Sequence, residues 1–142
     1  HNNHLFIHSY TILHMKIILD TNFLIYTAKE KIDYIEELSN LLNEDYQLVV
    51  PEKVVKELTS LKNDKLKKVS GKDKHAADLA LKLLKSNKIK EIKTKGKTVD
   101  ESIINLSKEN KKNIVCTLDR EMRKTLGRVI LLNKNKQLIL TS

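Results

Sequence analysis

The chain has 142 residues, of which 40% are hydrophobic and 32% charged, and its formal net charge is +9. This length and balance fit one globular domain that can bury a sizeable core. No apolar run reaches the roughly 18 residues needed to cross a bilayer, and the amino end lacks the pattern of a secretory signal. We therefore expect a cytoplasmic protein with no membrane partner. The single cysteine, Cys116, lies in an apolar run, which predicts a buried thiol and excludes an internal disulfide.

The positive charge is concentrated in one segment of the chain. Thirteen lysines and four acids lie between Lys62 and Lys97, so this window carries a charge equal to that of the whole chain. Lysines attract phosphates without reading a base sequence. The excess therefore favours a nucleic-acid partner. The alternative is a lysine-biased composition that only solvates one face, because lysine outnumbers arginine 24 to 3.

The first residues differ from those that follow. Residues 1–14 hold four of the five histidines, and Met15 then opens a well-patterned strand. We expect residues 1–14 to be a leader that is non-native or disordered, and residues 15–142 to form the folded domain.

Downstream of Met15, short runs rich in β-branched residues alternate with longer helical patterns. Strands are predicted for residues 16–19, 47–50, 88–92, 113–117 and 128–132, with a final edge strand within 134–141. Helices are predicted where apolar residues recur at helical spacing, over 32–42, 54–61, 76–84 and 99–106, and briefly after Asp119. Alternating strands and helices predict an α/β fold with a parallel sheet covered on both faces.

Two acids directly follow predicted strands. Asp20 closes the apolar run at residues 17–19, and Asp119 follows residues 113–118. The carboxyl ends of parallel strands meet at one edge of a sheet, where ligands bind, so the two carboxylates converge if their strands are neighbours. The alternative role for each is helix N-capping, which contributes roughly 1 kcal/mol when Asp performs it.

Helical geometry adds two further candidates. Glu57 borders the apolar face of its predicted helix and can reach a cleft. Asp100 flanks the apolar face of another helix, whereas Glu101 lies opposite that face and forms a capping box with Thr98. In isolation, an acid at such a border is more often an ordinary surface residue.

Together these residues would place four carboxylates at one edge of the sheet: Asp20, Glu57, Asp100 and Asp119. Like charges this close raise one another's pKa or require a cation, and oxygen ligands suit Mg²⁺ or Mn²⁺. Two such ions can activate a water and stabilise both oxygens of an attack on phosphorus. The sequence therefore suggests phosphodiester hydrolysis. It contains no glycine-rich phosphate loop, and it supports neither a phosphoaspartate site nor a serine, cysteine or histidine nucleophile.

The same motifs resemble those of PIN-domain nucleases over residues 15–140. The resemblance is carried by ILDTN with Asp20, KELTSL with Glu57, TVDESI with Asp100 and CTLDREMR with Asp119. It implies a three-layer α/β/α fold around a central parallel sheet of four or five strands. It also implies a metal-dependent endoribonuclease that cuts single-stranded RNA.

The resemblance implies roles for individual residues. Asp20, Asp100 and Asp119 would bind Mg²⁺ or Mn²⁺, and Glu57 would complete the catalytic acids. A surrounding shell of hydrogen bonds would come from Thr21, Asn22 and Thr117. Four lysines near the 76–84 helix would hold the RNA: Lys72, Lys74, Lys82 and Lys85.

The chain departs from the family's usual pattern at Glu101, where members often have Asp, and at Leu118, where they often have Asn. The segment KELTSLKN, the basic middle and the ending look more like the archaeal and eukaryotic ribosomal-RNA-processing branch than like VapC toxins. The expected role is thus rRNA or other RNA maturation, with ribosomal precursor particles as partners. The alternatives are a VapC-type toxin controlled by an antitoxin, and a non-catalytic RNA-binding or assembly module. A homodimer is a further arrangement that the family implies.

Overall fold

The structure is a computed structural model that describes residues 15–141, so the expected leader lies outside the described residues. Six strands form one sheet: β1 (Met15–Leu19), β2 (Tyr46–Pro51), β3 (Lys90–Ile92), β4 (Ile114–Cys116), β5 (Val129–Leu132) and β6 (Leu138–Thr141). The helices are α2 (Thr21–Lys29), α3 (Tyr34–Leu41), α4 (Glu52–Lys62), α5 (Gly71–Ser86), α6 (Val99–Ser107) and α7 (Arg120–Leu126). Every predicted strand is present.

The strand order in the sheet is β3-β2-β1-β4-β5-β6. All neighbours from β3 to β5 are parallel, while β6 runs antiparallel to β5. The parallel part thus has five strands, within the four or five that the resemblance implied, and β6 is the predicted edge strand. The order reverses at the centre, because the chain builds β2 and β3 on one side of β1 and then crosses to β4 on its other side.

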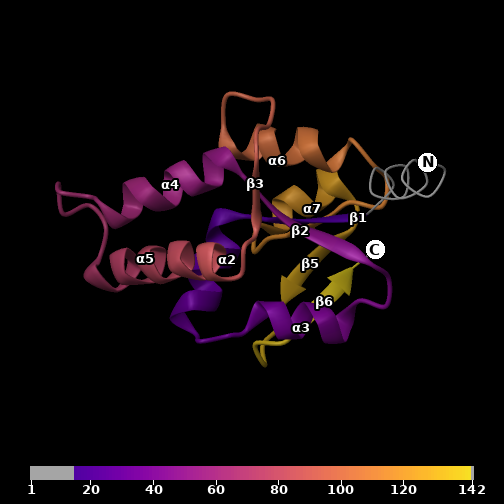
Figure 1. Ribbon diagram of the computed structural model, residues 1–142, viewed down its shortest axis with the longest axis horizontal. Helices are drawn as coiled ribbons and strands as arrows, with labels where there is room; N and C mark the ends of the chain where they lie inside the picture. The colour runs from indigo at the N-terminus through magenta and orange to yellow at the C-terminus, as the bar shows by residue number, and fades with distance from the viewer. Residues whose placement is uncertain (1–14, 142) are drawn as a thin grey trace, which may run out of the picture.

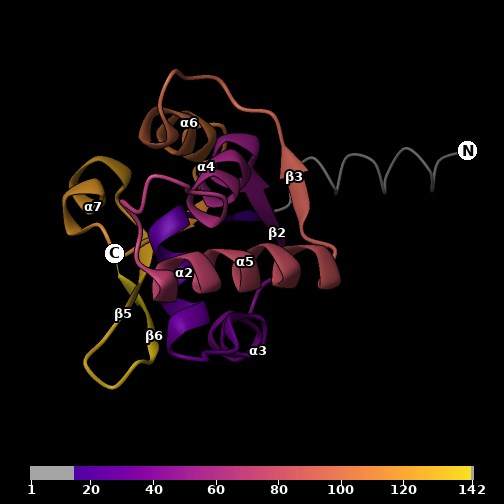
Figure 2. The same cartoon turned by 90° about the vertical axis from the view of Figure 1, so that its left-hand side faces the viewer.

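Helices cover both faces of the sheet, which confirms the predicted α/β/α arrangement. The two views show α3 and α5 on one side and α6 and α7 on the other (Figures 1 and 2). This division follows from the reversal of strand order, since right-handed crossovers in opposite directions place their helices on opposite faces. None of the helices in residues 15–141 is both long and apolar enough to span a bilayer.

The core lies between the central strands and the inner faces of the helices. Residues 17–19 of β1 are fully buried, as expected for a parallel strand covered on both sides. Phe23 of α2 packs edge-on against Tyr34 of α3, with ring centroids 5.9 Å apart. Cys116 in β4 is a fully buried free thiol, as predicted.

Polar side chains fix where several helices begin. Asp33 and Ser70 accept backbone N–H groups at the starts of α3 and α5. The predicted capping box at α6 is present, since Thr98 Oγ1 accepts the Glu101 N–H at 3.1 Å. The Glu101 carboxylate in turn accepts the N–H of Lys97, one residue earlier than in the usual box. Glu101 is therefore occupied by local structure, which leaves Asp100 as the candidate acid of this helix.

Candidate active site at the carboxyl edge of the sheet

Asp20 lies at the carboxyl end of β1, directly beside the end of β4. Its backbone N–H donates to the Cys116 carbonyl oxygen at 3.1 Å, one residue beyond the Leu19–Cys116 pair of the two strands. Only 5% of Asp20 is exposed. The two strands are neighbours, as the convergence of Asp20 and Asp119 required, and they meet where the strand order reverses. In open α/β sheets this is the position at which ligands bind.

Both carboxylate oxygens of Asp20 accept hydrogen bonds. Oδ1 accepts from the backbone N–H of Thr21, and Oδ2 accepts from the hydroxyl of Thr117, each at 2.7 Å. Asp20 is also the N-cap of α2. The capping role that the sequence left open is therefore present, and it does not compete with a position at the edge of the sheet. Held from two sides, the carboxylate has a fixed orientation.

Thr117 connects the two acids that follow strands. Its hydroxyl donates to Asp20 and accepts from the backbone N–H of Asp119 at 3.0 Å, and the residue is fully buried. Its own N–H donates to the Ile130 carbonyl of β5 at 3.1 Å. Asp119 in turn caps α7, where its Oδ1 accepts the Glu121 N–H at 2.9 Å. A single threonine thus ties the end of β4 to both acids.

The charges of Glu57 and Asp100 act on the Asp20 carboxylate. Burial raises the pKa of Asp20 above its ordinary value, and the hydrogen bonds from Thr117 and Thr21 oppose that rise. The negative charges of Asp100 and Glu57 raise the pKa of Asp20 further. Both of these acids are exposed, Glu57 on α4 and Asp100 on α6. Asp20 therefore experiences a negative field that a cation would relieve.

The remaining members of the predicted hydrogen-bonding shell behave differently from one another. Thr21 supports Asp20 through its backbone N–H, whereas its own hydroxyl is buried without a hydrogen-bond partner. Asn22 is exposed, and within residues 15–141 no hydrogen bond joins its side chain to an acid. Thr117 is thus the member of this shell whose side chain contacts Asp20.

Ser102 is a residue that sequence reasoning missed. It follows Asp100 by two positions on α6, is fully buried, and has a hydroxyl with no partner. Its spacing from Val99 and Leu106 places it on the apolar face of the helix. A serine on such a face costs free energy unless something satisfies it, and that pattern was visible in the sequence.

The donor types at this edge fit a hard divalent cation, because they are carboxylate and hydroxyl oxygens. The buried hydroxyl of Thr21, next to Asp20 in sequence, has no hydrogen-bond partner within the protein. The spacing is not that of a finished cage, since among residues 15–141 no three His, Cys, Asp or Glu side chains are close enough together to hold a metal ion. The structure thus fixes Asp20 and leaves Glu57 and Asp100 exposed around it.

The four lysines predicted to bind RNA all lie on α5. Three of them are exposed and Lys74 is partly covered. Lys82 forms an ion pair with Asp78 at 3.0 Å, so part of its charge is compensated within the protein. The outer face of α5 is therefore less uniformly positive than the sequence suggested.

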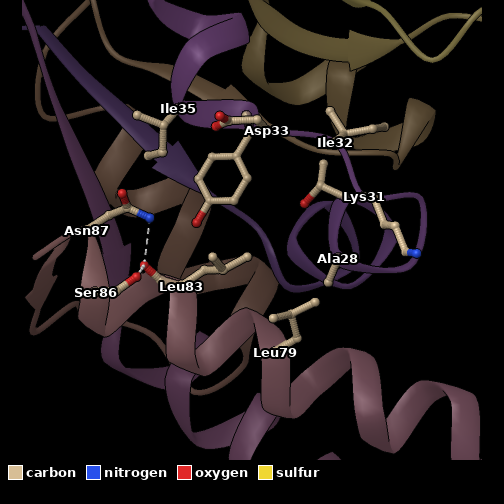
Figure 3. Close-up of a pocket in the computed structure, with 11 residues that line it drawn as sticks. Ala28, Lys31, Ile32, Asp33, Ile35, Leu79, Leu83, Ser86 and Asn87 are labelled. Carbon is tan, nitrogen blue, oxygen red and sulfur yellow. Dashed lines mark hydrogen bonds between the residues drawn. The ribbon is translucent and has the colours of Figure 1, made fainter.

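A separate hollow of about 400 Å³ lies at the other end of α2 (Figure 3). It is bounded by the end of α2, the start of α3 and the second half of α5, with apolar walls from Ala28, Ile32, Ile35, Leu79 and Leu83. Ala28 comes eight residues after Asp20, a rise of about 12 Å along a helix. None of the candidate acids lines this hollow, so it is distinct from the candidate active site.

The chain is similar in sequence to known proteins. Residues 17–135 match a family described as "PIN like domain". Over 66 residues the chain is 41% identical to ribonuclease VapC4 of Methanocaldococcus jannaschii, a stretch that covers 46% of this chain and 49% of that relative. The match to this relative thus spans about half of its length.

Solved structures agree on the fold. The PIN domain endonuclease Utp24 superposes with a TM-score of 0.67 at 21% identity, over 87% of this chain and 90% of that chain. A domain of a functionally unknown protein from Methanocaldococcus jannaschii gives a TM-score of 0.55 at 18% identity, over 84% and 91%. The matched family region contains all four candidate acids. The chain therefore belongs to the PIN-like domain family.

Proposed function

We propose that this protein is a metal-dependent endoribonuclease that hydrolyses phosphodiester bonds of single-stranded RNA. The observation that carries the proposal is the hydrogen-bonded series Asp20–Thr117–Asp119 where the strand order reverses, with the charges of Asp100 and Glu57 acting on Asp20. Membership of the PIN-like domain family and partial identity to a ribonuclease support the same activity.

In this proposal the acids have different tasks. Asp20, Asp100 and Asp119 would hold Mg²⁺ or Mn²⁺, and Glu57 would complete the group. Each carboxylate oxygen of Asp20 accepts one hydrogen bond and keeps a second lone pair for a cation. Asp100 and Glu57 are exposed and are free to turn toward it.

The cation and the lysines would both reduce the repulsion between the acids and the RNA. The acids and the RNA phosphates repel one another, so positive charge is needed between them and beside them. When bound at these acids, a divalent cation would supply that charge and would lower the pKa of a water beside the phosphate. The backbone of the RNA is held by the lysines of α5: Lys72, Lys74, Lys82 and Lys85.

Two cellular roles use this chemistry. The resemblance to the ribosomal-RNA-processing branch supports RNA maturation on precursor particles. The 41% identity to VapC4 over 66 residues supports the alternative, a toxin restrained by an antitoxin. Growth arrest on expression that a small protein encoded next to this gene reverses would favour the toxin. Accumulation of precursor rRNA on gene deletion would favour maturation.

The test of the activity uses a circular single-stranded RNA, which offers no ends to an exonuclease, with Mn²⁺, Mg²⁺ or EDTA. We expect cutting only with metal, and a loss of about 10²–10³-fold in rate for Asp20→Asn, the scale seen when one group that stabilises the transition state is removed. The matched control is Glu109→Gln, which neutralises an exposed acid in the segment that precedes β4, at the opposite edge of the sheet.

Two results would contradict the proposal. One is cutting by Asp20→Asn at the rate of the wild type, which would remove the site assignment. The other is RNA binding without cutting at any Mn²⁺ concentration, which would favour the non-catalytic RNA-binding module instead.

A further inference from the structure

Residues 62–74, which run from the last residue of α4 through the connecting loop to the first turn of α5, form the α4–α5 tip. It contains two acids and six lysines: Lys62, Lys65, Lys67, Lys68, Lys72 and Lys74. The two helices lie side by side and project from the body of the domain, with the tip at their free end, at the far left of Figure 1. The tip is therefore a basic surface that stands away from the sheet.

The tip has a defined shape because Asp64 organises its backbone. Its Oδ1 accepts the N–H of Leu66 at 3.3 Å, and its Oδ2 accepts those of Lys68 and Val69 at 2.9 and 3.0 Å. These bonds, that of Val69 first, hold the pKa of Asp64 below its ordinary value. Lys67 adopts a left-handed backbone with φ of 57°, which is uncommon for a residue other than glycine. The loop is thus held in one conformation by an ionised carboxylate.

Three lysines of the tip are available for a partner. Lys65, Lys67 and Lys68 are exposed, and none of them forms an ion pair within residues 15–141. Asp64 does not neutralise them through an ion pair, because its oxygens accept backbone N–H groups. Leu66, between these lysines in sequence, is 73% exposed. The loop between the two helices, residues 63–70, therefore offers three lysines without an ion-pair partner and one exposed apolar side chain.

The tip lies on the same side of the molecule as the acids. α4 begins directly after β2, at the sheet edge where β1 ends at Asp20. Val54 and Leu58 are buried, so the first part of α4 packs against the domain. Glu57 lies five residues before Lys62, the last residue of α4. This is a rise of about 7.5 Å along the helix. An RNA strand held at the tip would thus pass close to the acids.

We propose that the α4–α5 tip grips the RNA backbone beside the site of cleavage. Lys65, Lys67 and Lys68 contact phosphates, and Leu66 packs against an unstacked base. Single-stranded RNA suits this surface, because its backbone can follow a curved loop and its bases expose apolar faces. The inference rests on the proposed function and names residues outside α5 that bind the substrate.

The test measures binding of a labelled single-stranded oligouridine by fluorescence anisotropy in an Asp20→Asn background, which cannot cut the probe. The tip variant combines Lys65→Gln, Lys67→Gln and Lys68→Gln. Its matched control combines Lys108→Gln, Lys111→Gln and Lys112→Gln, which removes the same charge from the segment before β4, at the opposite edge of the sheet.

We expect the tip variant to lose about tenfold or more in affinity, and its slope of log K against log salt to fall by about 2, as the loss of three phosphate contacts on a single strand implies. The control variant should keep the slope. Leu66→Ala should weaken binding without altering the slope, because it removes no charge. Equal losses in the two triple variants, or no loss in either, would overturn the proposal, as would unchanged affinity in Leu66→Ala for the apolar contact.

The outcome separates this inference from the proposed function. If the wild type never cuts RNA but the tip variant alone loses binding, the endonuclease proposal fails and the tip stands as a binding surface. If the wild type cuts with metal and the tip variant binds and cuts equally well, the tip assignment fails alone. An acidic protein segment would then be the partner to examine for this surface.

Discussion

The carboxyl edge of the sheet and the α4–α5 tip each contain an aspartate that accepts several hydrogen bonds, yet the two pKa values move in opposite directions. Asp20 accepts two bonds and its pKa is raised, while Asp64 accepts three and its pKa is lowered. The surroundings explain the contrast. Asp20 is buried, and the charges of Asp100 and Glu57 act on it. Asp64 lies among backbone N–H groups and near the positive charge of Lys74.

The contrast separates two uses of one side chain. The charge of Asp20 is costly where it stands, because burial and like charges disfavour it, and a cation would remove that cost. The charge of Asp64 is favoured where it stands and serves to hold a loop. We propose a metal ion as the ligand of the first region and phosphates as the ligands of the second, and the following substitutions test each proposal.

Thr117→Val should have the largest effect on stability. It preserves shape but leaves Asp20 Oδ2 and the Asp119 N–H without their partner. We expect a loss of about 1–3 kcal/mol in the free energy of unfolding, measured with urea, and slower RNA cleavage. Thr117→Ser keeps the hydroxyl and should lose only about 0.8 kcal/mol for its missing methyl group. If the valine variant matched the serine variant in both measurements, Thr117 would not be orienting the acids.

Asp20→Asn should stabilise the metal-free protein, although we expect it to slow cutting. Asparagine keeps one oxygen that can accept the Thr21 N–H, its amide can donate to the Thr117 hydroxyl in place of the bond that Asp20 accepts, and it removes the buried charge. We expect a gain of about 0.5–1 kcal/mol at neutral pH in EDTA, comparable to other stabilising substitutions. Added Mg²⁺ or Mn²⁺ should then stabilise the wild type and leave the variant unchanged.

The pH dependence follows from the direction of the same shift. Since the folded pKa of Asp20 lies above the unfolded value, the folded state binds more protons between the two values. The contribution of Asp20 to stability therefore falls as pH rises from about 4 through the folded pKa, and stays lower above it. The difference between Asp20→Asn and wild type should widen over that range and then level off. A variant that is less stable than the wild type at neutral pH would contradict this account.

Much of the edge could be predicted because it depends on local patterns. Short β-branched runs identified the strands, and the rule that parallel strands end together placed Asp20 beside the end of β4. The contact from Thr117 to Asp20 could be expected only from the family resemblance, because it joins residues 97 positions apart through the register of β1 and β4. The absence of a ready-made metal cage within residues 15–141 was equally invisible, since it depends on where exposed side chains point.

For the basic segment, the sequence showed the composition but not the ion pairs. Its composition was plain, but the sequence could not tell which lysines are compensated. Asp78 pairs with both Lys62 and Lys82, although they lie on different helices, because α4 and α5 pack side by side. Asp64 could be expected to pair in the same way. It bonds to backbone N–H groups instead, and Lys65, Lys67 and Lys68 of the tip form no ion pair within residues 15–141.

Asp64→Asn and Asp78→Asn should have the smallest effects. Because each raises the net charge by one, a difference between them reports on the shape of the tip and not on its charge. Asp64→Asn leaves one acceptor oxygen where two served three backbone N–H groups, so it loses at least one of these bonds and loosens the tip. We expect its RNA affinity in the Asp20→Asn background to fall by about two- to threefold, since ordering the loop costs roughly 0.5 kcal/mol or more. Asp78→Asn frees Lys62 and Lys82 without disturbing the loop, so its affinity should rise slightly. If both substitutions raised affinity equally, charge alone would account for binding and the shape of the tip would have no part in it.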